Sequence, residues 1–350
     1  MTMVELSQIP HRRKNILTGD WVLVSPHRTD RPWQGELSPS ADEKRRQYVP
    51  DCYLCPGNKR ANRDLDPQYT GTYVFTNDFS ALLDNAPSLK QNRNDLLTMR
   101  SERGICRVVN FSPRHDLTLA EMTESEIGEV IAAWQNEYSS LASHPRINYV
   151  QIFKNKGALM GNSNPHPHGQ IWAQESSPVE PVKELKQFKA YYLKKKRSLL
   201  ADYLKLELRI QERVVYENDS FVILVPFWAV WPFETIIISK RRISDILQLK
   251  ESEKKDFANT LSVLTVKYDN LFKTSFPYSA GMHQSPTDGK DHKEWHFHMH
   301  FYPPLLRSSS IKKFMVGYEM LAEPQRDITP EYSAALLKGL SPVRYSICRV

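Results

Sequence analysis

Two long segments of the chain repeat their apolar residues every three or four positions, as amphipathic helices do. They cover residues 127–141 and 257–271. Thr123 and Glu126 have the spacing of a capping box, which predicts where the first helix begins. Short apolar runs lie before and after each helix and predict strands. We therefore expect a fold in which both kinds of element alternate and strands are the more numerous.

The pattern around these two helices occurs twice. Ser112 and Ser239 each follow an apolar strand, and they lie 127 residues apart. A strand with histidines ends each copy, and His168 and His298 lie 130 residues apart. The repeating unit is strand, helix, strand, histidine strand. Because strands outnumber helices, this unit favours an antiparallel α+β layout over alternating βαβ units.

The duplication predicts two halves that share one mainly antiparallel sheet with helices packed on it. We expect the boundary between residues 1–180 and 181–350, with a charged helix near residues 182–200 joining the halves. The basic run at residues 194–197 is interpreted as a solvated face of that helix. The last 40 or so residues fall outside the repeat.

Composition narrows the class of protein only slightly. A chain of 350 residues with 40% hydrophobic content can fill a core, and no stretch approaches the roughly 20 apolar residues of a membrane helix. The first residues contain charges and no apolar signal sequence, so a soluble cytoplasmic protein is expected. The net charge of +7 suits an anionic partner, either nucleic acid or a phosphorylated small molecule.

The segment with the clearest chemistry is residues 155–172, NKGALMGNSNPHPHGQIW. Its glycine, serine and asparagine residues predict a loop whose backbone donors can hold phosphate oxygens, and its two prolines stiffen the entry to a strand. Residues two apart on a strand share a face. His166, His168 and Gln170 are therefore expected to point the same way and to form a site.

A neutral imidazole can attack phosphorus directly and form a reactive phosphoramidate. His168 suits this role because it lies between the loop and Gln170, whose amide can donate to a phosphoryl oxygen. The alternative is a strand whose polar side chains merely satisfy one another. That alternative leaves the glycine-rich loop without a purpose.

Cys52 and Cys55 form a CxxC pair in a chain with too few cysteines for a disulfide framework. A tetrahedral zinc site needs two more ligands, for which His115 and His166 are candidates. A redox pair and two buried thiols remain the alternatives. Zinc bound here would anchor the strand that presents His168 and would be structural.

The second half contains a further set of histidines. Imidazoles in register with a carboxylate commonly bind a divalent metal, and iron or zinc would both fit. A polar strand without metal is the alternative. The candidate imidazoles are His283, His296, His298 and His300, and the candidate carboxylates are Glu175 and Glu184, between which spacing alone does not choose.

Taken together, these motifs resemble the galactose-1-phosphate uridylyltransferase family, a branch of the histidine triad superfamily. The resemblance covers nearly the whole chain. It implies a homodimer with a half-barrel sheet in each subunit, and a ping-pong exchange between UDP-glucose and galactose 1-phosphate through a uridylyl-histidine. The products would be glucose 1-phosphate and UDP-galactose. The residues that carry the resemblance are 11–13, 15–21, 24–28, 31–35, 51–55, 71–79, 164–172, 232–235, 276–278, 298–307 and 313–323.

The resemblance also implies roles for single residues. It places the nucleophile on His168 and the phosphate-binding glutamine on Gln170, with Ser163 beside them. The implied zinc ligands are Cys52, Cys55, His115 and His166. The implied ligands of a second metal, iron or zinc, are Glu184, His283, His298 and His300, which leaves His296 without a role.

Substrate contacts are implied in two groups, some of which the partner subunit supplies in the family. The uridine and phosphate contacts are Arg28, Arg31, Phe75, Asn77, Asp78, Asn155, Ser163 and Gln170, and the sugar contacts are Lys313, Val316, Tyr318, Glu319 and Gln325. One departure is Asn162, where the family commonly has cysteine. Because no role is assigned to that cysteine, we interpret the change as tolerated.

Two other functions compete with this interpretation. A dinucleoside polyphosphate phosphorylase or adenylyl-sulfate transferase of the same branch would use the same histidine but bind adenine, and the sugar-contact segment at residues 313–325 argues against it. A zinc-stabilised nucleic-acid-binding protein would explain the positive charge and the CxxC pair. This sequence, however, contains no basic stripe rich in aromatic residues, so neither nucleic acid nor a membrane is an expected partner.

Overall fold

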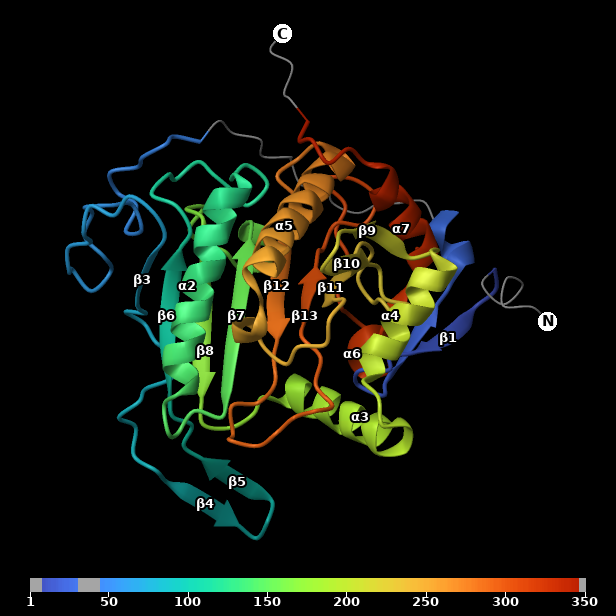
Figure 1. Cartoon of the computed structure of the whole chain (residues 1–350), viewed down its shortest axis with the longest axis horizontal. Helices are drawn as coiled ribbons and strands as arrows, with labels where there is room; N and C mark the ends of the chain where they lie inside the picture. The colour runs from blue at the N-terminus through green and yellow to red at the C-terminus, as the bar shows by residue number, and fades with distance from the viewer. Residues whose placement is uncertain (1–7, 31–44, 346–350) are drawn as a thin grey trace.

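The computed structural model describes residues 8–30 and 45–345 of the chain. Its centre is a nine-stranded sheet in which every neighbouring pair is antiparallel (Figure 1). In spatial order the strands are β3 (Tyr73–Thr76), β6 (Gly104–Asn110), β8 (His168–Gln174), β7 (Tyr149–Lys156), β12 (Tyr278–His283), β13 (His298–Tyr302), β11 (Thr235–Ser239), β10 (Phe221–Leu224) and β9 (Val214–Glu217). The antiparallel α+β prediction is confirmed.

The sheet is built from two equivalent halves that meet at its centre. Read from its outer edge inward, the first half has the order β3, β6, β8, β7. The second half repeats it as β10, β11, β13, β12 and adds β9 outside β10. The central strands β7 and β12 pair antiparallel, with Phe153 opposite Gly281 and Lys156 opposite Tyr278. The predicted duplication is therefore visible as one continuous sheet.

Two long helices, α2 (Glu124–Ala142) and α5 (Glu251–Phe272), lie side by side on one face of this sheet (Figure 1). The apolar residues of the sequence pattern are the buried ones, from Ile127 to Leu141 in α2. The predicted capping box is present, with Thr123 accepting from the backbone of Glu126. Both helices form because their apolar stripes are buried against the sheet.

The predicted charged helix near residues 182–200 is present, but it ends at Lys195 and a second helix follows it. The chain turns at Lys196, which adopts a left-handed conformation with φ of 57°, and Ser198 then caps the next helix. The predicted solvated face is confirmed, since residues 194–197 are exposed. The helices are α3 (Val179–Lys195) and α4 (Leu199–Ile210), and the later ones are α6 (Tyr318–Leu321) and α7 (Pro330–Gly339).

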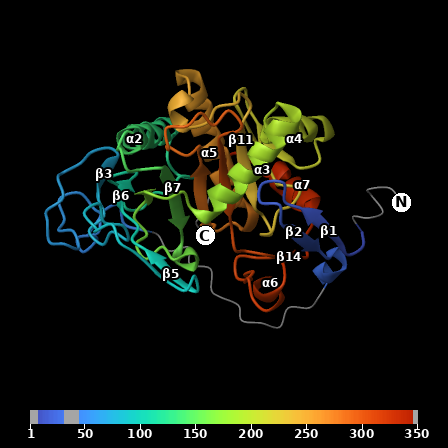
Figure 2. The ribbon, with the colours of Figure 1, turned by 90° about the horizontal axis from the view of Figure 1, so that it is seen from below.

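The remaining strands form two small sheets. A hairpin of β4 (Lys90–Arg93) and β5 (Leu97–Arg100) extends away from the body. A three-stranded sheet contains β1 (His11–Lys14), β2 (Trp21–Val24) and β14 (Gln325–Arg326). This sheet and α6 lie on the side of the main sheet opposite α2 and α5 (Figure 2). Within residues 8–30 and 45–345, no helix has the length and apolar character needed to cross a membrane.

The two halves differ in how their faces are covered. All residues of β10 and β11 are buried, because α5 packs on one face and side chains of α3 and α4 pack on the other. In β8 the residues alternate between buried and partly exposed. One face of the first half therefore stays open, and this is the face that a ligand can reach.

A buried ion pair connects the halves. The Nζ atom of Lys156 in β7 lies 2.7 Å from Oδ1 of Asp269 in α5, and both side chains are almost fully buried. Asp269 also accepts from the backbone nitrogen of Phe276 at 2.9 Å. Removal of one partner from such a pair is costly because it leaves the other charge buried alone.

We expect Asp269→Ala to lower the free energy of unfolding by about 3–5 kcal/mol, since Lys156 then loses its counter-charge. Denaturant unfolding at one protein concentration would measure this. The matched control is Asp291→Ala, whose carboxylate is 70% exposed beside Lys293 and is expected to change stability by less than about 1 kcal/mol. Equal losses in both variants would contradict a linking role for the pair.

Candidate active site and metal clusters

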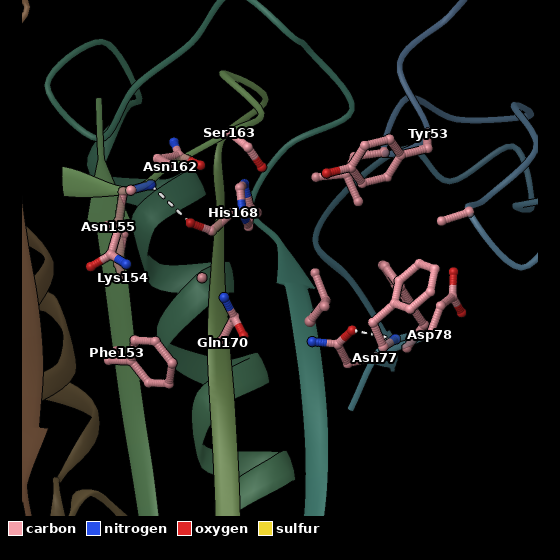
Figure 3. Close-up of a pocket in the computed structure, with 17 residues that line it drawn as sticks. Tyr53, Asn77, Asp78, Phe153, Lys154, Asn155, Asn162, Ser163, His168 and Gln170 are labelled. Carbon is pink, nitrogen blue, oxygen red and sulfur yellow. Dashed lines mark hydrogen bonds between the residues drawn. The ribbon is translucent and has the colours of Figure 1, made fainter. Parts of the chain in front are cut away.

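A cavity of about 290 Å³ lies on the open face of the first half (Figure 3). His168 and Gln170 reach it from β8 and Asn155 reaches it from β7, because residues of the same parity share that face. The structure thus brings together seven residues assigned by resemblance: Phe75, Asn77, Asp78, Asn155, Ser163, His168 and Gln170.

His168 is oriented by its own backbone neighbour. Its Nδ1 atom donates to the carbonyl oxygen of His166 at 2.8 Å. Nε2 makes no hydrogen bond to the described part of the chain, so it is the ring nitrogen that can react. Burial, together with the nearby ammonium of Lys154, lowers the pKa of His168 to about 4. The ring is therefore neutral near pH 7, and its lone pair is available.

The expectation that His166 points the same way as His168 is wrong. Strand β8 begins only at His168, and His166 lies before it between two prolines, which have no N–H to donate to a sheet. The ring of His166 turns away to the cysteine pair, where Nδ1 lies 3.6 Å from Sγ of Cys55. Its Nε2 donates to the carbonyl of Ser112 at 2.9 Å.

Cys52, Cys55, His115 and His166 form a buried cluster whose ligand atoms lie within 4.8 Å of one another. The two sulfurs come from a tight turn in which the backbone nitrogen of Cys55 donates to Cys52. Burial lowers the pKa of His166 to about 3, so its ring is neutral, as a metal ligand must be. Two thiols and two imidazoles are a donor set that zinc prefers. The residues fit a metal.

Glu184, His283, His298 and His300 form a second cluster with the same spacing of ligand atoms. Glu184 Oε2 lies 2.9 Å from Nδ1 of His283, and Glu175 is instead paired with Arg103 at 2.7 Å. Burial alone would raise the pKa of Glu184, but His283 and His298 hold it well below its usual value. Nε2 of His298 and both ring nitrogens of His300 are buried without hydrogen bonds, and a metal would satisfy one on each ring.

The two histidine segments repeat their hydrogen bonds as well as their sequence. His298 donates through Nδ1 to the carbonyl of His296 at 2.7 Å, and His296 donates through Nε2 to Ser239 at 2.7 Å. These bonds match those of His168 and His166. His296, named above as a candidate ligand, does not join the second cluster, because β13 begins only at His298 and the ring of His296 turns to Ser239.

Sequence reasoning missed one charged group behind the cavity. Lys154 is buried, lines the cavity and donates from Nζ to the carbonyl of His168 at 2.9 Å (Figure 3). Burial lowers its pKa to about 7. A lysine inside a strand pattern normally indicates a solvated face, so its residue type could not have identified this position.

The other predicted substrate contacts line a different cavity, of about 560 Å³. Its walls come from β2, β14 and the segment around α6, and Arg28 there pairs with Asp327 at 3.3 Å. The structure does not bring these residues to His168 within one chain. They are Arg28, Lys313, Val316, Tyr318, Glu319 and Gln325, while Arg31 lies outside the described residues.

Comparison with protein families gives two matches in succession. The model described as galactose-1-phosphate uridyl transferase, N-terminal domain, matches residues 2–178, and the corresponding C-terminal domain matches residues 184–348. With these matches, the duplicated sheet and the imidazole beside an open cavity define a nucleotidyltransferase. The chain belongs to the galactose-1-phosphate uridylyltransferase family and is a uridylyltransferase of galactose metabolism.

Relatives support this assignment over the full length. The chain is 49% identical to galactose-1-phosphate uridylyltransferase from Haemophilus influenzae, with 98% of each chain covered, and 49% identical to that from Saccharomyces cerevisiae, with 96% of each covered. A solved uridylyltransferase has a TM-score of 0.74 at 26% identity, covering 93% of this chain and 97% of that one. An ADP-glucose phosphorylase from Arabidopsis thaliana with bound ADP-glucose has a TM-score of 0.74 at 25% identity, covering 95% and 99%.

We expect Cys52→Ser to lower the zinc bound per subunit and to lower the thermal unfolding midpoint, because serine is a much poorer zinc ligand. Elemental analysis of purified protein would measure the metal. Cys106→Ser is the matched control, since Cys106 is fully buried but lies outside the cluster. Zinc content that stays unchanged in Cys52→Ser would contradict the assignment.

Proposed function

We propose that the enzyme exchanges a uridylyl group between UDP-glucose and galactose 1-phosphate through a covalent uridylyl-histidine at His168. The observation that carries the proposal is the bond from Nδ1 of His168 to the carbonyl of His166 at 2.8 Å. It holds the tautomer in which Nε2 carries the lone pair, next to the cavity. A nucleophile that forms a covalent intermediate divides the exchange into two half-reactions.

In the first half-reaction, Nε2 of His168 attacks the α-phosphorus of UDP-glucose. An N–P bond forms, and the bond from this phosphorus to the bridging oxygen breaks. Glucose 1-phosphate leaves with the electron pair. The positive charge on the imidazole is stabilised by the His166 carbonyl, which accepts from the Nδ1 proton throughout. Gln170 and Ser163 line the cavity and supply neutral donors for the phosphoryl oxygens.

In the second half-reaction, a phosphate oxygen of galactose 1-phosphate attacks the same phosphorus. The N–P bond breaks, its electron pair returns to Nε2, and UDP-galactose forms. The uridine is expected against Phe75, Asn77 and Asp78, which line the cavity beside His168. Asn155 lies on the adjacent strand and offers its amide to the phosphates.

We further propose that the working enzyme is a homodimer in which two chains complete each site. The substrate contacts that the family resemblance implies lie in two separate cavities of one chain. A second copy of the chain would reunite them if it placed its cavity with Arg28 and Lys313 next to His168. The division of roles between residues 1–180 and 181–350 is part of this proposal. The two family matches, which end at 178 and begin at 184, support that boundary.

Both metal clusters have structural roles in the proposal. Zinc held by Cys52, Cys55, His115 and His166 would anchor the segment that leads into His168. Iron or zinc held by Glu184, His283, His298 and His300 would tie α3 to β12 and β13 in the second half. Neither metal takes part in the transfer itself.

We expect UDP-glucose labelled in its α-phosphate to transfer label to the protein when no acceptor is present. The label should be acid-labile, should map to His168 and should be discharged by galactose 1-phosphate. His168→Gly should accept none and should lose turnover, because it has no nucleophile. The matched control is His144→Gly just after α2, a partly exposed histidine that does not line the cavity.

Label from an adenylyl donor, with none from UDP-glucose, would preserve the histidine chemistry but overturn the choice of uridine. Full activity of His168→Gly would overturn the nucleophile. Label that forms on another residue of the wild-type protein would do the same.

We expect subunit complementation if two chains build each site. His168→Gly and Arg28→Ala are each expected to be nearly inactive as homodimers. In a heterodimer of the two, one site combines an intact His168 with an intact Arg28 and should regain activity. Co-expression with two different affinity tags would isolate the heterodimer. A heterodimer no more active than its parents would contradict the shared site.

A further inference from the structure

Trp172 lies next to Gln170 on the open face of β8, two residues further along the strand. Its indole Nε1 donates to the side-chain oxygen Oε1 of Gln170 at 3.0 Å. An indole N–H can donate but cannot accept a hydrogen bond. The partner atom must therefore be the amide oxygen of Gln170, and the amide nitrogen must point the other way.

That other direction is toward His168. Figure 3 shows the nitrogen of the Gln170 amide on the side of the nucleophile, with the oxygen turned away from it. Within residues 8–30 and 45–345, this nitrogen donates to no acceptor of the protein and remains available to a ligand in the cavity. A phosphoryl oxygen needs a donor there, and an amide rotated by half a turn would present a repelling oxygen instead.

The indole itself is held in place by packing. Trp172 meets the ring of Phe153 on the neighbouring strand edge to face, with centroids 5.6 Å apart and planes at 81°. Phe153 lines the same cavity. Asn155 offers a contrast, because its amide oxygen accepts from the hydroxyl of Ser279 at 2.7 Å, and a hydroxyl can reverse its role. The indole N–H, unlike a hydroxyl, determines which end of the Gln170 amide faces it.

We propose that Trp172 is a positioning residue that makes Gln170 an obligate hydrogen-bond donor to the transferred phosphoryl group. This inference rests on the proposed role of Gln170 in uridylyl transfer. Trp172 touches neither substrate nor nucleophile in this account, and it acts entirely through the amide. A residue that acts only through one partner has no effect once that partner is removed.

The test is a double-mutant cycle measured by the single-turnover rate of label transfer from α-phosphate-labelled UDP-glucose to the protein. Trp172→Phe keeps an aromatic ring against Phe153 but removes the donor. We expect the rate constant to fall on the order of 3- to 10-fold, as the loss of one neutral hydrogen bond would cause, with little change in the substrate concentration at half-maximal rate. In the Gln170→Ala background, the same substitution should change the rate less than about 2-fold.

Trp21→Phe serves as the control, because Trp21 is an exposed tryptophan on β2. Thermal unfolding of each variant would identify a general loss of structure. An equal fall in both backgrounds would overturn the inference, since Trp172 would then act through packing. An unchanged rate in Trp172→Phe, alongside a slow Gln170→Ala, would overturn it as well. An unchanged rate in Gln170→Ala would instead refute the proposed role of Gln170, and the inference with it.

Discussion

The site depends on one short hydrogen bond, from Nδ1 of His168 to the carbonyl of His166 at 2.8 Å. A free imidazole exchanges its proton between two nitrogens, and this bond removes that freedom by assigning the proton to Nδ1. The carbonyl can only do so if its own residue is immobile. His166 is held by its contact with the cysteine cluster and by the bond from Nε2 to Ser112. The cluster of two cysteines and two histidines and the oriented ring of His168 are therefore parts of one arrangement.

The same arrangement occurs in the second half, where it serves another purpose. His298, His296 and Ser239 repeat the bonds of His168, His166 and Ser112. What differs is the surroundings, since the positions 130 residues after Phe153 and Gln170 hold His283 and His300. With Glu184 added from α3, these side chains form a set of ligand atoms that could hold a metal ion. An oriented imidazole suits both tasks, because each needs one ring nitrogen with a free lone pair.

The halves also differ in how far a ligand can reach the face of the sheet opposite α2 and α5. The strands β10 and β11 are buried on both faces, because the segment after the first half folds into α3 and α4 and covers them. Among residues 8–30 and 45–345, no helix covers the corresponding face of β8, and a cavity lies there at His168 and Gln170. The duplication alone would permit one such cavity in each half. Because α3 and α4 cover the corresponding face of the second half, the open cavity lies in the first half.

The sequence by itself determined the two long helices and the repeated order of strands around them, since helix periodicity, the capping box and the spacing of the repeated serines and histidines are local properties. It also identified which residue types could be nucleophile and ligands. Only the tertiary structure decided that His166 and His296 leave the strand face, and that Arg28 and Lys313 line a separate cavity. It alone revealed buried Lys154 and the bond from Trp172 to Gln170. These outcomes depend on which distant segments pack together, and that is set by burial and hydrogen-bond satisfaction over the whole chain.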